Sequence, residues 1–343
     1  MIADRRCRLS EMPLVGDAAC GAVRCGEAYH RSMLDVQCSM FNVQSFIPFV
    51  SSALQSPPGG RVGFNMKILY TSDIHANHTH LSSMLLVAEG EDVDGIIIGG
   101  DIVPHNLPNS FGAEPLKAQA KYLEAVFIPA LRKFKQKCDV EIYLDLGNDD
   151  FICNRTILEK HDGTLLNLLH FRKTRLSDDV DVIGYMNVPP TPFTRKDLEK
   201  PDSKAQPHAP GNHIVLNGYS STSGVLEKTV LKLGSDDTIE NDLARLSEII
   251  DRPFIFVSHS PPYNTSLDVL YNMIHAGSVG IRDFIQRWAM EGKLIASFHG
   301  HIHESPARSG SIVTEIGGTL CVNPGQGSGE GSPFRYVIFR LEG

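Results

Sequence analysis

Polar residues able to bind metal ions follow five apolar segments of this 343-residue chain. The five groups are DIH at 73–75, GGD at 99–101, GNDD at 147–150, SHSP at 258–261 and HGHIH at 299–303. Carboxylate, amide and imidazole ligands without cysteine suit borderline divalent ions such as Mn, Fe, Zn, Ni or Co. The candidate ligands are Asp73, His75, Asp101, Asn148, His259, His301 and His303.

Each of these groups alone is a weak signal, because an isolated DxH or GGD is usually a polar strand end or a turn. Ligands in open α/β sheets collect at the carboxyl ends of strands, so five such ends in succession indicate one shared crevice. In the last group, alternation along an extended segment predicts that His301 and His303 point to the same side. We therefore expect the seven side chains to meet at one point.

The elements that must position these residues begin near residue 67, where short apolar runs start to alternate with amphipathic stretches. This alternation is typical of strands joined by helices in a mainly buried sheet, and it predicts an α/β fold. Helices are expected over 116–137, 238–250 and 279–290, with Ser278 as the N-cap of the last. The expected strands are 67–71, 95–98, 140–146, 181–186, 253–257, 294–298, 312–316, 319–322 and 335–341.

The order of the five groups resembles that of the calcineurin-like metallophosphoesterase superfamily, whose pattern is DxH, GD, GNH followed by an acidic residue, a later histidine and GHxH. The resemblance covers roughly Met66 to the C-terminus, and DIHAN, GHIHES and VNPGQ are similar to segments of small prokaryotic members. It implies a four-layer α/β/β/α sandwich, in which two packed sheets are flanked by helices.

The resemblance also implies a binuclear metal centre. The first ion would be held by Asp73, His75, Asp101 and His303, and the second by Asp101, Asn148, His259 and His301, with Asp101 as the bridge. Two such ions, about 3.5 to 4 Å apart, can share a hydroxide that attacks phosphorus. The expected reaction is therefore hydrolysis of a small phosphate ester. Because the histidines must bind as neutral imidazoles, metal affinity is expected to fall below about pH 6.

The chain departs from the superfamily pattern at Asp149, where GNH has a histidine often treated as the acid for the leaving oxygen. An aspartate is ionised at pH 7 unless burial or the neighbouring Asp150 raises its pKa, so phosphodiesters are favoured over phosphomonoesters. His275 is a further catalytic candidate, if it and the amide end of the 279–290 helix face the phosphate. The other histidines that could replace the missing acid are His78, His80 and His105.

Composition limits the partners of the chain. A net charge of −8 and a pI of about 5.9 argue against a protein that coats nucleic acid, although a nuclease is not excluded. No run approaches the roughly 18 to 20 apolar residues that cross a bilayer, so no membrane partner is expected. Seven cysteines, of which Cys138, Cys153 and Cys321 lie near apolar segments, fit reduced thiols and a cytoplasmic location.

Four questions stay open at the level of sequence. Residues 1–65 read as an N-terminal extension, which is a poorly ordered tail, a non-native start before Met66 or a targeting segment, and 66–343 as one metallophosphoesterase domain. Residues 189–212 read as a long surface excursion that borders the site or only covers the outside. A non-catalytic scaffold that binds protein partners is the alternative to an enzyme, and the oligomeric state is not determined.

Overall fold

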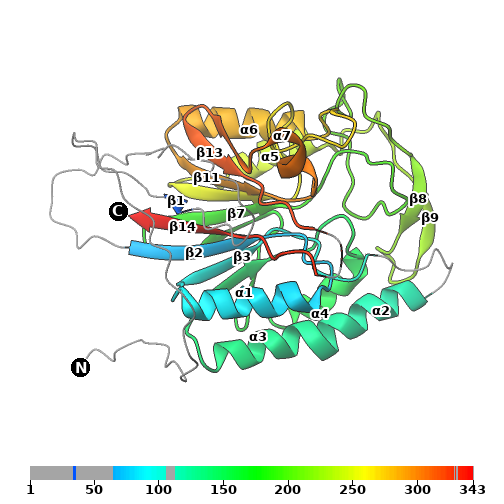
Figure 1. The fold of residues 1–343 in the computed structure, drawn as a ribbon. Coiled ribbons are helices and arrows are strands. Elements are labelled where there is room, and N and C mark those ends of the chain that lie inside the picture. The colour runs from blue at the N-terminus through cyan, green and yellow to red at the C-terminus, as the bar shows by residue number, and fades with distance from the viewer. Residues whose placement is uncertain (1–33, 36–64, 106–112, 328, 330, 343) are drawn as a thin grey trace.

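A computed structural model of the chain describes residues 34–35, 65–105, 113–327, 329 and 331–342. Over these ranges two six-stranded sheets pack face to face, and helices cover the outer face of each (Figure 1). The predicted four-layer α/β/β/α sandwich is confirmed. Of the proposed extension 1–65, only Leu34–Asp35 and Asn65 are described, both within strands, and the rest of that prediction lies outside the described residues.

The first sheet has the order β1-β14-β2-β3-β4-β5. Strands β2 to β5 run parallel, whereas β14 is antiparallel to both of its neighbours. The strands are β1 (Leu34–Asp35), β2 (Asn65–Thr71), β3 (Gly95–Ile98), β4 (Glu141–Leu144), β5 (Asn167–Leu168) and β14 (Val337–Glu342). The carboxyl ends of β2, β3 and β4 therefore lie at one edge of the sheet.

The second sheet has the order β12-β13-β11-β10-β7-β6. Its central strands β7, β10, β11 and β13 run parallel. Phe254 and Phe256 belong to the core under the helices, whereas Ile255 and Val257 belong to the core between the sheets. Burial on both faces explains why these strands are continuous apolar runs. The strands are β6 (Arg172–Arg175), β7 (Asp181–Tyr185), β10 (Phe254–Ser258), β11 (Leu294–His299), β12 (Val313–Ile316) and β13 (Thr319–Val322).

The helices form the two outer layers (Figure 1). Against the first sheet lie α1 (His78–Gly90), α2 (Glu114–Tyr122) and α3 (Ile128–Lys135), the last two joined by a π-helical turn, Leu123–Phe127. Against the second sheet lie α5 (Ile239–Ser247) and α6 (Val279–Met290). The Ser278 side chain accepts a hydrogen bond from the Ile281 amide, so the predicted N-cap is confirmed. Shorter helices are the 3₁₀ turn Ile152–Asn154, α4 (Arg155–Glu159) and α7 (Ser305–Ser309).

Every strand predicted from the sequence is present, with ends that differ by at most two residues. The predicted helix 116–137 is α2, the π-helical turn and α3 in succession, and 279–290 is α6 itself. The sequence analysis missed α1 and several short strands. None of the described helices is long and apolar enough to cross a membrane. Cys138, Cys153 and Cys321 are free thiols, as predicted.

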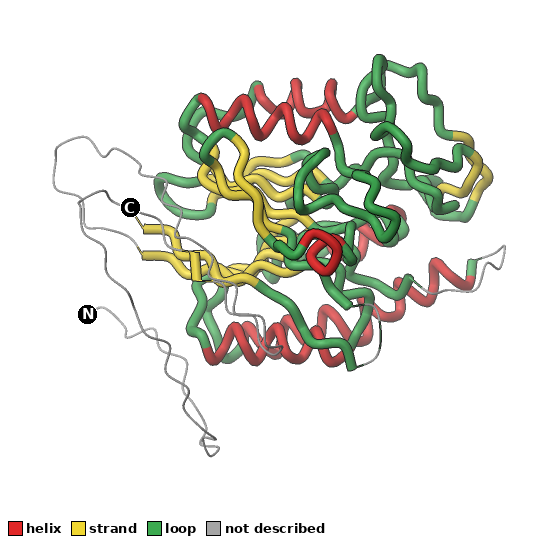
Figure 2. The backbone as a smooth tube through the Cα atoms, turned by 45° about the horizontal axis from the view of Figure 1, so that its top comes forward, coloured by secondary structure: helices red, strands yellow, loops and turns green. Residues whose placement is uncertain are grey.

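The segment 189–212, predicted as a surface excursion that borders the site or only covers the outside, contains buried residues along much of its length. Lys196 and Glu199 form a buried ion pair, with 2.8 Å between Nζ and Oε2. Asp202 is buried, and its carboxylate accepts hydrogen bonds from the Val279 amide and the Ser278 hydroxyl, both at 2.5 Å. The segment is thus fixed to the start of α6. It leads into a separate two-stranded ribbon, β8 (Asn217–Ser220) and β9 (Glu227–Val230) (Figure 2).

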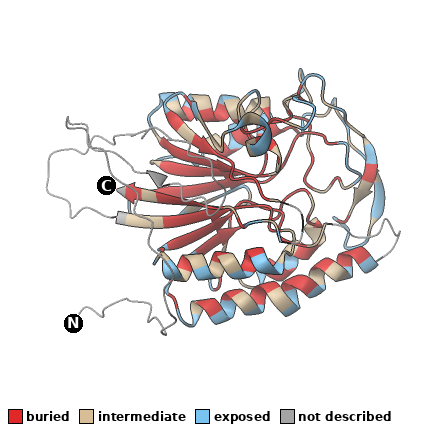
Figure 3. Ribbon diagram, in the orientation of Figure 1, coloured by how far each residue is buried: buried red, intermediate tan, exposed pale blue. Residues whose placement is uncertain are grey.

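The interface between the two sheets is an apolar core without exposed strand faces (Figure 3). At its centre Tyr70 of β2 stacks on Phe298 of β11, with ring centroids 4.7 Å apart. Phe298 also meets the edge of Phe339 in β14 at 5.6 Å. Because these contacts join strands of different sheets, they fix how the strand ends of one sheet face those of the other.

Replacing Phe298 by alanine is expected to lower the free energy of unfolding by about 3 to 5 kcal/mol, because it removes buried aromatic area and leaves a cavity between the sheets. Chemical denaturation followed by circular dichroism measures this loss. Met290→Ala is the control, since that side chain is 76% exposed and its loss should change stability by less than about 0.5 kcal/mol. Equal effects of the two substitutions would contradict the assignment of Phe298 to the inter-sheet core.

Candidate metal centre

Three loops from the first sheet and two from the second meet at the carboxyl ends of their strands. The loop after β2 carries Asp73 and His75, the loop after β3 carries Asp101, and the loop after β4 carries Asn148. The second sheet contributes the residues that follow β10 and β11. All seven side chains named from the sequence come together here, and their role as metal ligands stays a prediction.

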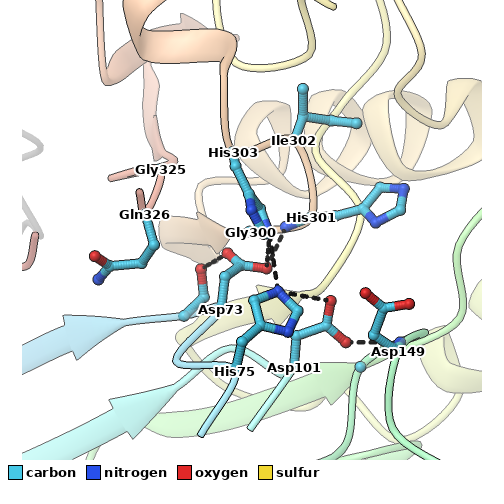
Figure 4. Close-up of polar contacts among 12 residues, drawn as sticks. Asp73, His75, Asp101, Asp149, Gly300, His301, Ile302, His303, Gly325 and Gln326 are labelled. Carbon is cyan, nitrogen blue, oxygen red and sulfur yellow. Dashed lines mark hydrogen bonds and ion pairs between the residues drawn. The ribbon is translucent and has the colours of Figure 1, made fainter. Parts of the chain in front are cut away.

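Four of the side chains form one compact donor group. Ligand atoms of Asp73, His75, Asp101 and His303 all lie within 4.8 Å of one another. The Nε2 atoms of His75 and His303 are 3.2 Å apart, and His303 Nε2 is 3.1 Å from Asp73 Oδ1 (Figure 4). This is the set that the family resemblance assigned to the first ion.

The remaining side chains gather around His259, which is fully buried. Its Nε2 atom is 3.0 Å from Asn148 Oδ1 and 3.2 Å from Asp101 Oδ2, and the His301 ring centroid is 5.3 Å from its own. The same Asp101 oxygen is 3.7 Å from His75 Nε2. Asp101 is therefore shared by the two groups, in the bridging place that the resemblance implied.

The prediction that His301 and His303 point to the same side is wrong. His301 has φ +67°, so residues 301–303 are not an extended segment in which alternation would apply. The His301 ring is directed away from His303 (Figure 4) and lies near His259, whereas His303 contacts Asp73. The two histidines thus belong to different donor groups, although they lie in the same short loop.

Unusual backbone conformations aim the ligands. Asp73, His75, Asp101 and His301 all have φ between +46° and +67°, a region that costs free energy for residues other than glycine. Gly147 has a different function: a Cβ there would overlap with the carboxylate of Asp101. The close approach of the loops after β3 and β4 therefore requires glycine at this position.

Asp150 holds these two loops together and does not face the site. It is fully buried, and its carboxylate accepts hydrogen bonds from the amides of Ile102, Val103 and Gly147 at 2.9 to 3.1 Å. Burial and the charge of Asp101 raise its pKa to about 8. A catalytic role of Asp150 stays a prediction that this geometry does not favour, because its hydrogen bonds are with three backbone amides.

Three side-chain amides that the sequence analysis did not single out hold the same loops. Gln119 of α2 donates to the carbonyl of Asp149 at 2.9 Å and accepts from the Phe151 amide at 2.8 Å. Asn323 donates to the carbonyls of Gly300 and Ile302. The third, Gln326, bonds to Thr71 at the end of β2. For the last two, the VNPGQ segment was the available signal; no motif pointed to Gln119.

The four histidines form two pairs that differ in pKa. Burial opposes protonation of His259, but the carboxylates of Asp101 and Asp73 outweigh it and raise its pKa to about 10. In the same way Asp73 raises the pKa of His303 to about 9. Burial lowers the pKa of His75 and that of His301 to about 3. Without metal, two imidazoles are thus charged and two are neutral at pH 7.

The donor group of Asp73, His75, Asp101 and His303 could hold a divalent cation. Two protonated histidines beside two buried carboxylates place positive charge where a cation would bind. The facing Nε2 atoms of His75 and His303 are suited to share one ion once His303 has lost its proton, since neutral imidazole nitrogens are metal ligands. The donors, carboxylate, amide oxygen and imidazole, suit the transition-metal ions named above, and the identity of the metal stays open.

His275 is not brought to these donors by any contact within the described part of the chain. Its Nδ1 atom lies 2.8 Å from Asp268 Oδ1, and its ring meets the edge of Tyr263. The amide end of α6 is already bonded to the carboxylate of Asp202, so the expectation that it faces a phosphate is wrong. A catalytic role of His275 stays a prediction that this geometry does not favour.

Of the other histidines considered, His105 lies nearest to the donors. Its ring centroid is 4.2 Å from that of His75. His80 is buried and contacts the Ser332 carbonyl at 3.0 Å, and His78 meets the edge of Tyr122. His78 and His80 therefore have structural contacts of their own, and only His105 borders the site.

The chain belongs to the calcineurin-like phosphoesterase family, whose model matches residues 66–305. An uncharacterized protein of Methanocaldococcus jannaschii is 36% identical over 107 residues, which are 31% of this chain and 42% of that protein. A solved Thermus thermophilus protein is 16% identical, with 76% of this chain and 90% of that one covered and a TM-score of 0.46. A dimetal phosphatase from Danio rerio is 9% identical, with 81% and 98% covered and a TM-score of 0.46.

Metal binding is expected to release about two protons per chain near pH 7, because the cations must displace those on His259 and His303. With pKa values of about 10 and 9, both groups are protonated below pH 9, so metal affinity rises with pH through this range. The loss of affinity thus begins near pH 9 and not near pH 6 as the sequence suggested. Calorimetry in buffers of different ionisation enthalpy counts the protons, and a count of zero would contradict these pKa values.

Proposed function

We propose that the chain hydrolyses phosphoric esters with a pair of divalent cations, and that a phosphodiester is a better substrate than a phosphomonoester. The observation that carries the proposal is the position of Asp101, whose Oδ2 atom lies 3.7 Å from His75 Nε2 and 3.2 Å from His259 Nε2. One carboxylate shared by two donor groups is what a binuclear site requires. Membership of the calcineurin-like phosphoesterase family supports the same reaction class.

The chain's own residues prepare the site for an anion. Asp73 and Asp101 are buried beside His303 and His259, so their charges are balanced inside the protein. When bound, two divalent cations would add net positive charge for the phosphate group and activate water as the nucleophile. The strained backbone of the donor loops keeps the ligands in place before the substrate arrives.

Asp149 is the basis for the preference between ester classes. Burial and the charge of Asp101 raise its pKa to about 6, while the Arg195 guanidinium acts in the opposite direction. Asp149 Oδ1 accepts a hydrogen bond from Arg195 at 3.1 Å, so the carboxylate already has a cationic partner. With a pKa of about 6 the carboxyl is mostly ionised at pH 7, and Arg195 favours the ionised form, so leaving groups that need no proton are favoured.

Two other functions are less well supported. A non-catalytic scaffold has no need to hold four donor residues in left-handed backbone conformations, each of which costs stability. A nuclease would need a basic surface, and the net charge of the chain is −8. A small phosphate ester is the substrate class that we infer. A cytoplasmic location is consistent with the free thiols of Cys138, Cys153 and Cys321.

Hydrolysis of bis-p-nitrophenyl phosphate is expected to require added Mn, Zn, Fe, Ni or Co and to fall at least about 100-fold in Asn148→Ala, since loss of even an outer partner of a metal site costs up to that much. Metal content measured with the rates shows whether the second donor group is lost. Lys117→Ala is the control, because that side chain is 69% exposed and forms a surface ion pair with Glu114. Equal activity with and without metal would sink the proposed function.

The ester preference is tested by the ratio of kcat/KM for bis-p-nitrophenyl phosphate to that for a simple alkyl phosphate. We expect a large ratio, because the alkyl leaving group needs a proton that Asp149 supplies poorly. Asp149→His restores the residue of the family pattern and should raise the alkyl phosphate rate relative to the diester rate. Equal rates on both substrates for the unchanged protein would contradict the assigned preference.

A further inference from the structure

Arg195 brings a positive charge to the edge of the metal centre from the segment 189–212. Its Nη1 atom donates to Asp149 Oδ1 at 3.1 Å and also to the main-chain carbonyl of Asp149. The Asp149 amide in turn donates to Asp101 Oδ1 at 2.8 Å. The guanidinium is therefore connected through a single residue to the carboxylate shared by the two donor groups.

The position of the guanidinium is fixed from several sides. It lies over the Phe151 ring, with 4.4 Å between Cζ and the ring centroid, and its side chain is only 14% exposed. The main chain at Arg195 forms a bridge with Tyr219 of β8, and the next amide, that of Lys196, donates to the Tyr219 carbonyl at 2.9 Å. A planar cation held in this way has lost most of its rotational freedom before any ligand binds.

Arg195 has hydrogen-bonding capacity beyond its contacts with Asp149. A guanidinium has five N–H donors, and both hydrogen bonds to Asp149 start from Nη1. Its Nε atom is buried and has no partner among the described residues. A buried donor without an acceptor costs free energy, and an anion bound at the guanidinium would recover it.

His105 lies beside the first donor group. It packs against His75, with ring centroids 4.2 Å apart. In Figure 4, Asp149, the partner of Arg195, lies next to Asp101 on the side away from His75. Arg195, Asp149 and His105 thus border the region where a substrate would meet the donors.

From these contacts we infer that Arg195 binds a non-bridging oxygen of the substrate phosphate and that Asp149 is its positioning residue. The inference rests on the proposed function for the identity of the substrate. A fixed guanidinium stabilises the charge that develops on phosphate oxygens without transferring a proton. The aspartate that replaces the histidine of the family pattern then orients a cation, and the site exchanges proton donation for electrostatic stabilisation.

The test compares Arg195→Ala with Arg245→Ala in the full chain loaded with Mn. Arg245 is the matched control, because it also pairs with an aspartate, Asp242, and lies over a phenylalanine ring, Phe171, at 5.4 Å. The Kd for inorganic phosphate is measured by calorimetry. We expect Arg195→Ala to raise it about 10- to 100-fold, the usual effect of losing a hydrogen bond to a charged group. Arg245→Ala should leave it unchanged, and the metal content of both should equal that of the unchanged protein.

One further variant and one rescue experiment separate the binding of phosphate by Arg195 from a purely structural role. Arg195→Lys keeps the charge but loses the planar fork, so it should recover only part of the phosphate affinity. Guanidinium chloride added to Arg195→Ala should restore phosphate binding and hydrolysis in part, whereas it should not change Arg245→Ala. A purely structural role of Arg195 predicts no rescue by free guanidinium.

The role of Asp149 is tested by its coupling to Arg195. Asp149→Ala should weaken phosphate binding about as much as Arg195→Ala, and the double variant should be no weaker than either, because the second change removes a side chain that no longer acts. Independent, additive losses would overturn the positioning role of Asp149.

The possible failures are distinguishable. Unchanged phosphate affinity in Arg195→Ala, with normal metal content and metal-dependent hydrolysis, overturns the inference and leaves the proposed function intact. Metal-dependent phosphate binding that is lost in Arg195→Ala, in a protein that hydrolyses no phosphate ester, supports the anion site and overturns the proposed function. Loss of metal from Arg195→Ala also overturns the inference, because the arginine would then support the donor loops and not the substrate.

Discussion

The candidate metal centre depends on the burial of the Asp101 carboxylate between loops of both sheets. Its oxygens lie near His75, His259 and the Asp149 amide, which come from three other loops. A buried charge of this kind is strongly destabilising unless partners surround it. The partners of Asp101 are His259 of the second sheet and the Asp149 amide. Gly147 leaves room for the carboxylate.

Loops from several strands must meet at one point. This requirement explains both the positive φ values at the site and the side chains that hold its loops. Loops that leave parallel strands diverge unless the backbone turns sharply, and here the turns occur at ligand residues with positive φ. Asp150, Gln119 and Asn323 hold these turns by accepting from or donating to main-chain groups of neighbouring loops. Most of the buried polar residues around the site are therefore explained by loop geometry, and only a few are free to act on a substrate.

Asp149 stands where the family pattern has a histidine. This difference changes the chemistry of the site and also the residue that contacts position 149. A protonated imidazole has no acceptor atom and would repel Arg195, whereas the carboxylate accepts its N–H directly. The segment 189–212 is fixed by Asp202 at α6 and by the main-chain bridge to β8, so it can hold the guanidinium in one place. The aspartate and the arginine are thus best understood as one unit.

The sequence by itself determined the α/β class, the strands and the ligand candidates, because buried parallel strands are continuous apolar runs and ligands follow their carboxyl ends. It missed α1, whose buried His80 stands where an apolar residue would mark the helical period. It also misjudged His301, since a positive φ is a tertiary demand that the residue type does not encode. Only the tertiary structure could show that Asp150 supports the loops and that Arg195 reaches Asp149 across 46 positions of sequence, because such contacts depend on how the chain packs.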